Sequence, residues 1–432
     1  MRDTTKRPMA LSEIYEKISR IIDGMKDEIV KTLTQLISIP AISPDYGGEG
    51  ELDKANALLE IIKNWGFDEV RRIDAPDKRA KGGVRPNILA IYRGTDPNAG
   101  KLWIVAHLDV VPPGDLSAWT VTEPFKPRIV NDRVYGRGSE DNGQSLVASL
   151  YAVKALMELG IRPRKTVVLA FVSDEETGSE YGIKYLVRNN PELFDTRDSA
   201  LVPDAGNSDG SFIEVAEKSI LWVRFRVIGK QTHASTPNKG LNAHEVAITL
   251  AYLLKNMLTT KYDMRDPLYD PPESTFVITM ASNPSASPNI MPGVHEFVMD
   301  CRVLPQYNLD DILRDMDTVA NLVKAIYGRV IDGEQLPRIE REIIQRLDAP
   351  KPTSPDSEIV KTLTKVLKET RGIEPRIGGI GGGTFAAYFR AMGIPAVVWS
   401  TIDEVAHQPN EYSKVPNLIN DTKTIATLIA TL

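Results

Sequence analysis

The stretch Leu-Trp-Ile-Val-Ala-His-Leu-Asp at residues 102–109 joins an apolar run to a polar end. A short apolar run of this kind is typical of a buried strand, and residues i and i+2 of a strand point to the same side. We therefore predict that the side chains of His107 and Asp109 emerge together where this strand ends. A carboxylate next to an imidazole is common at metal sites, because it fixes the tautomer of the ring and raises its basicity. An ordinary hydrogen-bonded pair is the other explanation, and the rest of the chain has to distinguish the two.

Strands and helices alternate on both sides of this stretch. The β-branched run over residues 166–172 is typical of a parallel strand covered on both faces, and a helix over residues 144–159 precedes it. Helical spacing of apolar residues also predicts one helix over residues 11–36. This alternation predicts an α/β domain with a mixed, largely parallel sheet that is covered by helices. We assign residues 1–211 and 349–432 to this domain.

The pattern changes near Ser211, where strands with one polar face replace the buried apolar runs. The elements expected after that point follow the order β-α-β-β-α-β, with strands at 220–228, 275–280, 296–303 and 339–347 and helices at 243–257 and 309–326. This order describes a ferredoxin-like α+β sandwich of one antiparallel sheet and two helices. We predict that residues 212–348 form a domain inserted into the first one.

Composition limits the class of protein. The chain has 432 residues, a net charge of -6 and 42% hydrophobic residues, so a soluble protein with a sizeable core is expected and nucleic acid is not. The single cysteine, Cys301, excludes an internal disulfide and favours a reducing compartment. Residues 1–10 are polar, and the chain has no apolar run long enough for a signal peptide or a membrane span. We therefore expect a cytoplasmic protein that binds neither nucleic acid nor membranes.

Acidic and imidazole side chains follow several strands of the predicted α/β domain. They are His107 with Asp109, Asp141, Glu175 with Glu176, Asp204 and His407. Ligands of open α/β sheets bind beyond the carboxyl ends of the strands, so these side chains are expected to converge. Two imidazoles with several carboxylates suit zinc better than magnesium or calcium. Taken singly, these acids are better explained as helix caps, charges at helix N-termini or turn formers, but those roles do not explain why all of them follow strands.

Together these residues resemble a family of two-zinc metallopeptidases and amidohydrolases. The family includes acetylornithine deacetylase, succinyl-diaminopimelate desuccinylase, aminoacylase, glutamate carboxypeptidase and several dipeptidases. The resemblance runs from residues 36–40 to residues 406–411, and its most specific pieces are His107-Leu108-Asp109, Tyr135-Gly136-Arg137-Gly138, Asp174-Glu175-Glu176 and Ala406-His407. It implies a catalytic zinc-binding α/β domain and an inserted lid or dimerisation domain. It also implies two Zn²⁺ ions per subunit, for which Co²⁺ or Mn²⁺ would substitute.

The resemblance assigns a ligand role to five of these residues. It implies that Asp141 bridges two metals, that His107 and Asp204 complete one metal, and that Glu176 and His407 complete the other. Two metals of this kind activate a water molecule and polarise the amide carbonyl.

The resemblance also implies two catalytic roles beside the ligands. Asp109 would orient His107, and Glu175 would be the general base that passes a proton to the leaving amine. The expected reaction is hydrolysis of an amide bond in an N-acyl amino acid or a short peptide, of the deacylase, desuccinylase or carboxypeptidase type.

The inserted domain and the glycine-rich loop expected over residues 378–383 supply further residues of the implied site. His233 matches a family histidine that binds the tetrahedral oxyanion, usually across the interface of a homodimer. Asn289 and Arg302 match positions that hold the substrate carboxylate, and the backbone of Gly382 and Gly383 would approach the substrate. Without the resemblance, a loop histidine at 233 and a strand-face salt bridge at Arg302 are the simpler explanations.

Two alternatives stay open. Family members that recognise a free amino terminus typically have Asp at the position of Asp204, whereas acylases and carboxypeptidases usually have Glu, so a dipeptidase or aminopeptidase is the first alternative. The second is a protein of the same scaffold that binds a metal or ligand without catalysis. The chain also departs from the usual family pattern at Asn142 and Phe385.

Overall fold

The structure is a computed structural model that describes residues 10–282, 285 and 287–432. The polar segment at residues 1–9, for which no signal peptide is predicted, lies outside the described residues. The chain divides into two compact units: unit 1 comprises Met1–Val215, Pro352–Gly378 and Thr384–Leu432, and unit 2 comprises Ala216–Lys351 and Gly379–Gly383. The short glycine segment thus belongs to unit 2, which the sequence did not indicate.

Unit 1 is built on an eight-stranded sheet in the order β1-β2-β6-β3-β7-β18-β8-β17. Its strands are β1 (Glu69–Pro76), β2 (Val84–Tyr92), β3 (Lys101–His107), β6 (Thr166–Val172), β7 (Ser199–Val202), β8 (Phe212–Glu217), β17 (Arg376–Ile380) and β18 (Ala396–Val398). The four central strands β6, β3, β7 and β18 run parallel, while β1, β2 and β8 pair antiparallel to their neighbours. The expected mixed, largely parallel sheet is confirmed.

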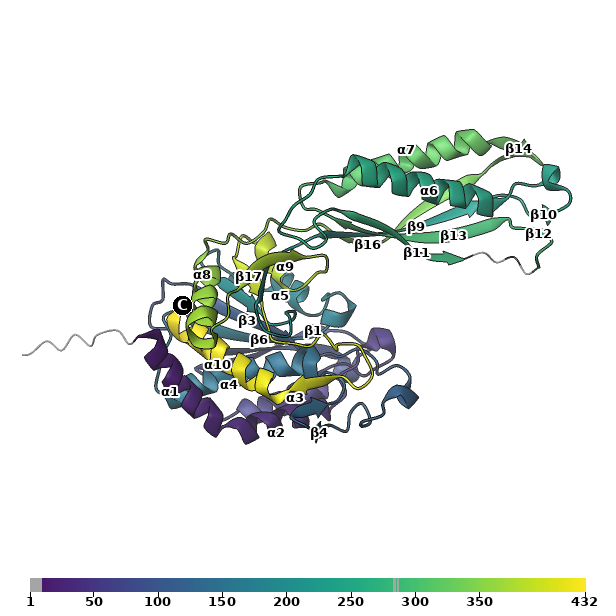
Figure 1. Cartoon of the computed structure of the whole chain (residues 1–432). Coiled ribbons are helices and arrows are strands. Elements are labelled where there is room, and N and C mark those ends of the chain that lie inside the picture. Colours follow the sequence, from purple (N-terminus) through teal and green to yellow (C-terminus); the bar gives the residue numbers. More distant parts are fainter. Residues whose placement is uncertain (1–9, 283–284, 286) are drawn as a thin grey trace, which may run out of the picture. The chain divides into compact units, whose positions relative to one another are not determined.

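Helices cover both faces of this sheet (Figure 1). On one face, α5 (Ile183–Asn189) and α9 (Ala386–Ala391) pack on a core that includes Trp103, Val105 and Phe389. On the other face, α4 (Ser145–Glu158) lies against β3 and β6 and packs against α10 (Val415–Thr431). The remaining helices of the unit are α1 (Leu11–Gly24), α2 (Lys26–Ile37), α3 (Leu52–Ile62) and α8 (Glu358–Arg371).

The N-terminal helical segment differs from the prediction. The single helix expected over residues 11–36 is divided into α1 and α2 at Met25, whose backbone has φ -96° and ψ 3°. Gly24 ends α1, and glycine is a poor helix former, which explains the break. Both helices still turn apolar residues such as Ile18, Ile22 and Leu33 into the core.

A small three-stranded sheet joins two segments that are far apart in the sequence. Its order is β19-β5-β4, with β4 at Arg128–Val130, β5 at Arg133–Tyr135 and β19 at Tyr412–Lys414. Tyr135 pairs with Tyr412, so the chain that precedes Asp141 lies beside the chain that follows His407. The sequence did not predict these strands, because three residues are too few for an alternating pattern to stand out.

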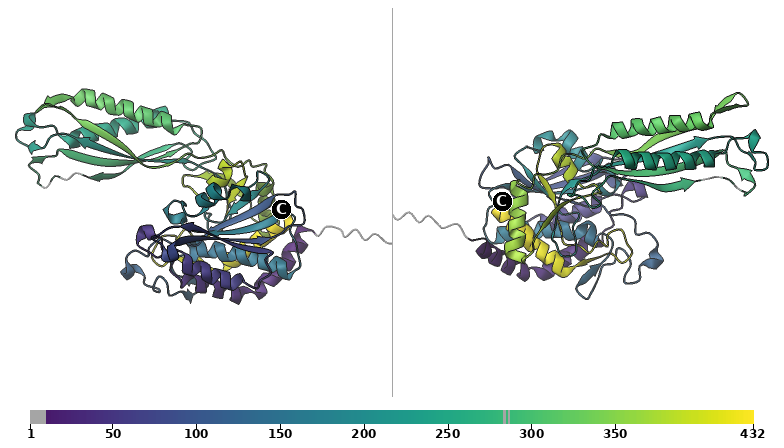
Figure 2. Two further views of the ribbon diagram at one scale, coloured as in Figure 1. Left: turned by 180° about the vertical axis from the view of Figure 1, so that it is seen from behind. Right: turned by 45° about the horizontal axis from the view of Figure 1, so that its top comes forward.

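Unit 2 has the predicted β-α-β-β-α-β order. Its antiparallel sheet follows the order β11-β13-β9-β16, and α6 and α7 lie side by side on one face of that sheet (Figures 1 and 2). The elements are β9 (Ser219–Ile228), α6 (Ala243–Lys261), β11 (Thr275–Ser282), β13 (Val294–Val303), α7 (Leu309–Tyr327) and β16 (Arg338–Leu347). Between sheet and helices, the rings of Phe225 and Phe297 stack with centroids 5.2 Å apart in the core. The expected ferredoxin-like α+β fold is confirmed.

Two short antiparallel strand pairs extend unit 2, and only the second is a hairpin. β10 (Thr232–His233) pairs with β12 (Ile290–Met291), and β14 (Arg329–Ile331) pairs with β15 (Glu334–Leu336). Among the residues that the structure describes, none of the helices combines the length and the apolar character needed to cross a lipid bilayer.

The glycine-rich loop expected over residues 378–383 is partly a strand. β17 extends to Ile380, and the amide of Gly379 donates to the carbonyl oxygen of Leu268 at 2.6 Å. A Cβ atom at Gly379 would lie 2.5 Å from two ring carbons of Tyr269, so a side chain has no room there. Close packing against Tyr269 therefore explains a glycine that the sequence alone assigns to a loop.

A buried ion cluster lies under the loop that follows β6. The guanidinium group of Arg85 donates to both carboxylate oxygens of Glu51 at 2.6 Å and to Asp174 at 3.1 Å, and its Nη1 lies 3.5 Å from Asp77. Arg85 and Glu51 are completely buried. Asp174 has φ 69°, a left-handed conformation that is uncommon for a non-glycine residue, and its carboxylate accepts the amide hydrogen of Tyr181 at 3.1 Å. The cluster therefore holds the start of the segment that carries Glu175 and Glu176.

We expect Arg85→Met to lower the free energy of unfolding by about 3–5 kcal/mol, because it leaves buried carboxylates without a cation. Urea denaturation measures the change. The control is Arg79→Met, which removes a side chain that is 47% exposed but also pairs with Asp77, and it is expected to cost no more than about 1 kcal/mol. Equal losses for the two variants would contradict the importance of the buried cluster.

Candidate metal centre

The strand order of unit 1 brings the carboxyl ends of three strands to one edge of the sheet. His107 is the last residue of β3 and pairs with Val172, the last residue of β6. Glu175 and Glu176 follow β6 in a single 3₁₀ turn, and Asp204 comes two residues after the end of β7, which neighbours β3 on the other side. Neighbouring parallel strands therefore deliver these four side chains to the same place.

Asp141 lies between the two predicted imidazole ligands. Its Oδ1 atom is 2.9 Å from Nε2 of His107, and its Oδ2 atom is 3.0 Å from Nε2 of His407. The two oxygens of one carboxylate thus face two different imidazoles, which is the arrangement that a ligand shared by two metals needs. Asp141 is in the irregular turn at Ser139–Gln144 that precedes α4.

The remaining acids divide between the two imidazoles. Asp204 Oδ1 is 3.4 Å from Nε2 of His107, and both carboxylate oxygens of Glu176 are 3.2 Å from Nε2 of His407. The structure thus brings together all five side chains that the sequence predicts as metal ligands. Ligand atoms of His107, Glu175 and Asp204 also lie within 4.8 Å of one another, so Glu175 is as close to the first group as a ligand would be.

Asp109 supports both the imidazole and the acidic turn. Nδ1 of His107 lies 2.9 Å from the backbone carbonyl oxygen of Asp109 and 3.5 Å from its carboxylate. That carboxylate, which is completely buried, accepts the amide hydrogens of Glu175 and Glu176, both at 3.0 Å. The side chain that we predict to orient His107 therefore also fixes the turn that presents Glu175 and Glu176.

Burial and mutual repulsion change the proton affinities of the two glutamates. Burial, followed by the charge of Asp204, raises the pKa of Glu175 well above its ordinary value. Burial and the charge of Asp141 raise the pKa of Glu176 to about 7. Glu175 accepts no hydrogen bond that the structure records for its carboxylate, and the side chain is 20% exposed, so this carboxylate is available to exchange protons.

The same carboxylates raise the pKa values of the two histidines. Burial alone would lower the pKa of His107, but hydrogen bonds to Asp109, Asp141 and Asp204 outweigh burial and hold that pKa well above its ordinary value. Hydrogen bonds to Asp141 and Glu176 raise the pKa of His407 to about 10. Clustered carboxylates therefore attract positive charge strongly at this point, and a set of two imidazoles and several carboxylates fits zinc.

Lys54 is a functional candidate that the sequence analysis missed. Its ammonium group is buried and donates to the carbonyl oxygen of Leu108 at 3.0 Å, directly behind His107. Burial lowers its pKa to about 8, against the opposing attraction of Asp109 and Glu51. A signal was present, because Lys54 shares one face of α3 with Leu58 and Ile62 at a spacing of four residues, where an apolar residue is expected.

The sequence-predicted residues of unit 2 fall into two groups at opposite ends of its sheet. His233 pairs with Ile290, and the amide of Ala234 donates to the carbonyl oxygen of Asn289 at 2.9 Å, so His233 and Asn289 are neighbours. Arg302 is near the other end of β13, a strand of ten residues and thus roughly 30 Å long. His233 and Arg302 of one chain therefore cannot contact the same small substrate.

Arg302 already has partners within unit 2. Its guanidinium group donates to both carboxylate oxygens of Asp300, at 2.7 and 3.1 Å, and to the carbonyl oxygen of Gly381 at 2.8 Å. The strand-face salt bridge considered from the sequence is thus present, beside the glycine segment predicted to bind substrate. At Gly383, an added Cβ atom would lie 3.1 Å from the side chain of Leu347. At Gly382, the nearest atom to an added Cβ would be 3.7 Å away, so packing restricts only Gly383.

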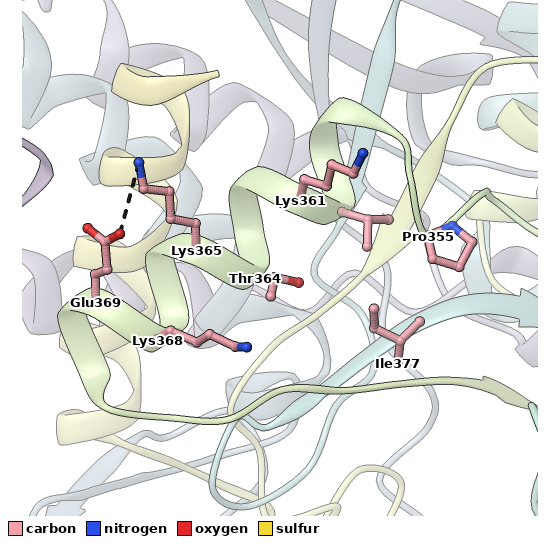
Figure 3. Close-up of a pocket in the computed structure, with 8 residues that line it drawn as sticks. Pro355, Lys361, Thr364, Lys365, Lys368, Glu369 and Ile377 are labelled. Atoms are coloured by element: carbon pink, nitrogen blue, oxygen red, sulfur yellow. Dashed lines mark ion pairs between the residues drawn. The ribbon is translucent and has the colours of Figure 1, made fainter.

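A separate hollow of about 370 Å³ lies on the surface of α8 (Figure 3). It contains none of the residues predicted for the site. Its charged lining consists of Lys361, Lys365, Lys368 and Glu369, of which Lys365 and Glu369 form an ion pair at 3.9 Å. Exposed lysines of this kind are ordinary for a solvated helix face, and the hollow offers no acid–base chemistry comparable to the cluster around Asp141.

Comparison with known proteins agrees with the geometry. The chain is 39% identical over 402 residues to a metallohydrolase of Methanocaldococcus jannaschii, covering 91% of this chain and 96% of that protein. It is 26% identical over 389 residues to the succinyl-diaminopimelate desuccinylase of Nitratiruptor sp., covering 89% and 94%. Human carnosine dipeptidase 1 has a similar fold, with a TM-score of 0.71 at 19% identity over 98% of this chain and 99% of that one.

The profile of peptidase family M20/M25/M40 matches residues 103–431, which include every residue of the candidate centre except Lys54. Members of this family are metal-dependent hydrolases of amide and peptide bonds, and the residues around Asp141 are compatible with a metal site. The family that the sequence motifs resemble is thereby confirmed, and the chain belongs to peptidase family M20/M25/M40.

Proposed function

We propose that this metallohydrolase holds two zinc ions and cleaves the amide bond of an N-acyl amino acid or a short peptide. The observation that carries the proposal is the position of Asp141, with one carboxylate oxygen 2.9 Å from His107 and the other 3.0 Å from His407. Asp204 would complete the His107 metal and Glu176 the His407 metal. Co²⁺ or Mn²⁺ would fit the same donors. A metal pair, when bound, supplies a Lewis acid for the amide carbonyl and lowers the pKa of a water molecule.

Glu175 is the proposed general base. Its amide hydrogen bond to Asp109 fixes the backbone, while its carboxylate lies 3.9 Å from His107 and is partly open to solvent. Burial raises its pKa, which allows this carboxylate to take a proton from the attacking water and pass it to the leaving amine. Glu176 is suited to a different task, because both of its oxygens face His407.

An N-acyl amino acid is the proposed substrate class, and desuccinylases are among the relatives of the chain. The alternative is a dipeptide with a free amino terminus, which is supported by the Asp at position 204 in place of a longer Glu. The side chain of Asp204 is 8% exposed and also accepts a hydrogen bond from Asn142 at 2.9 Å. A non-catalytic binding role has no such observation in its favour.

Because the one cysteine, Cys301, is buried and free, we also propose that the enzyme works in the reducing cytoplasm.

A homodimer through unit 2 is part of the proposal. β11 is an edge strand, and its Val277 and Met280 are 48% and 66% exposed. The outer faces of the two helices also expose apolar side chains, namely Ile248 and Tyr252 on α6 and Leu322 and Ile326 on α7. Exposed apolar side chains of this number support a protein interface. His233 and Asn289 would then serve the active site of the partner subunit.

We expect the zinc-loaded enzyme to hydrolyse N-succinyl and N-acetyl amino acids, and to lose this activity with a chelator. Glu175→Gln should lower kcat by about 10²–10⁴-fold and keep the zinc content of the wild type, since it removes the base and no ligand. The control is Glu180→Gln, an exposed acid of the same segment that should stay fully active. An active Glu175→Gln enzyme would refute the mechanism. Faster hydrolysis of dipeptides than of acylated amino acids would favour the alternative substrate.

The stability of the chelated enzyme should fall as the pH rises. Folding raises the pKa of Glu176 from 4.5 to about 7 and that of His407 from 6.5 to about 10, so the folded state binds more protons than the unfolded state over these intervals. Both contributions are present at low pH and are lost as the pH passes the folded pKa. Zinc binds the deprotonated groups, so the rise in Tm on adding zinc should grow with pH.

Thermal unfolding with EDTA and with zinc at pH values of about 5.5, 7 and 8.5 measures this difference, and magnesium, which prefers oxygen ligands, is the control. A zinc effect that is constant or shrinks with pH would contradict the assignment of Glu176 and His407 as ligands.

We expect subunit mixing to restore activity if His233 serves the partner. His233→Ala should lower kcat by about 10²–10³-fold. When His233→Ala and Glu175→Gln subunits are mixed, half of the dimers are mixed and one of their two sites has both residues, so about a quarter of the wild-type activity should return. Assay of the mixture against each parent measures this. No activity above the mean of the two parents would show that His233 does not act across a dimer.

A further inference from the structure

We infer that Glu140 is a positioning residue that holds His407 next to Asp141. Two buried carboxylates form a reciprocal clasp: Glu140, next to Asp141, binds the loop of His407, and Glu411, close to His407 in the chain, binds the loop of Asp141. This inference rests on the proposed function, because it takes Asp141, Glu176 and His407 as the ligands of one metal. It assigns a separate role to two acids, Glu140 and Glu411, that belong to neither proposed ligand set.

The first half of the clasp starts from Glu140. This residue is next to Asp141 in the chain and is 4% exposed. Its Oε2 atom accepts the amide hydrogen of Asp403 at 3.0 Å, and its Oε1 atom accepts that of Val405 at 2.7 Å. Val405 is two residues before His407, so Glu140 holds the backbone from which His407 extends.

The second half starts from Glu411, four residues after His407. It is 1% exposed, and its Oε1 atom accepts the amide hydrogens of Glu140 at 3.0 Å and Asp141 at 2.9 Å. Its Oε2 atom accepts that of Gly138 at 3.0 Å and a hydrogen bond from Nη1 of Arg137 at 2.7 Å. Glu411 therefore holds the backbone from which Asp141 extends, and the two loops fix one another.

The loop of His407 needs this support. Glu404, His407 and Asn410 have φ values of 59°, 63° and 59°, in the left-handed region that non-glycine residues rarely adopt. Such a conformation persists where surrounding contacts enforce it. The amides of Asp403 and Val405 bracket Glu404, the first of these residues, and both donate to Glu140.

The other ligand group has a different support. His107 is held in β3 by strands on both sides, and Asn142 links it to Asp204, since Asn142 Oδ1 accepts the amide hydrogen of His107 at 3.2 Å and its Nδ2 donates to Asp204 at 2.9 Å. Glu140 contacts neither residue through the hydrogen bonds that the structure records for its carboxylate. Loss of Glu140 should therefore affect the two metals unequally.

Zinc titration of the metal-free enzyme by calorimetry tests the inference. In Glu140→Gln, one oxygen becomes an amide that cannot accept a backbone hydrogen. We expect the zinc held by His107 and Asp204 to keep its Kd within about threefold, and the zinc at His407 to bind roughly 10–100-fold more weakly. Titration with Co²⁺, followed by visible absorption, should show the same loss of one of two sites.

The matched control is Asp198→Asn. Asp198 is also a buried carboxylate of unit 1 that caps backbone amides, but it accepts from Lys101 at 2.8 Å and from Nε1 of Trp103 at 2.9 Å, at the opposite end of β3. This variant should lose stability and keep both zinc affinities. Equal weakening of both zincs in Glu140→Gln, or no weakening of either, would overturn the inference.

Two results keep the inference separate from the proposed function. A wild type that fails to bind two zinc ions refutes the proposed function, whereas a wild type with two zincs and an unaffected Glu140→Gln refutes only the clasp. If Glu140→Gln does not fold, hydrogen exchange of the metal-free wild type tests whether Glu140 holds the amides of Asp403 and Val405. Slow exchange of the amides of Asp403 and Val405 supports the clasp, and exchange as fast as in an exposed loop overturns it.

Discussion

The mutual repulsion of the carboxylates gathered at the carboxyl ends of β3, β6 and β7 is the constraint on which unit 1 depends. Asp141, Glu176 and Asp204 all lie within 3.5 Å of an imidazole nitrogen, and burial removes the water that would weaken their repulsion. The fold opposes this repulsion with groups that belong to no ligand set. Backbone amides fix Asp109 and Glu411, and two buried cations, Arg85 and Lys54, lie behind the cluster. Bound metal ions would neutralise the remaining negative charge, so metal binding and the stability of the fold are coupled.

Unit 2 adds a different constraint, which is distance. His233 and Asn289 lie together at one end of its sheet, and Arg302 lies with Gly381 near the other. A small substrate is much shorter than β13, so one copy of unit 2 cannot use both ends on the same molecule. The proposed dimer would resolve this, because each active site would then take one group from each chain. The paired state of Arg302 also means that a substrate carboxylate would have to compete with Asp300.

Much of the fold was predictable from the sequence, because long apolar runs and their alternation with helices define the sheet of unit 1 and the β-α-β-β-α-β order of unit 2. The sequence was also sufficient to name Asp141 and the four other side chains of the proposed ligand sets, since their motifs resemble those of the family. What it missed depends on contacts between distant segments. β5 and β19 are too short to recognise singly, the glycine at 379 is explained only by Tyr269, and the hydrogen bonds of Glu140 reach residues more than 260 positions away. Lys54 was detectable as a charge on the apolar face of α3, but its place behind His107 was not.

The proposed metal centre depends on Asp141 being shared between two metals at this edge of the sheet. The most direct test is a crystal structure of the zinc-loaded protein with anomalous diffraction measured at the zinc absorption edge. We expect two anomalous peaks, one beside each oxygen of Asp141, with His107 and Asp204 around the first and Glu176 and His407 around the second. A single peak, or two peaks of which either makes no contact with Asp141, would contradict it.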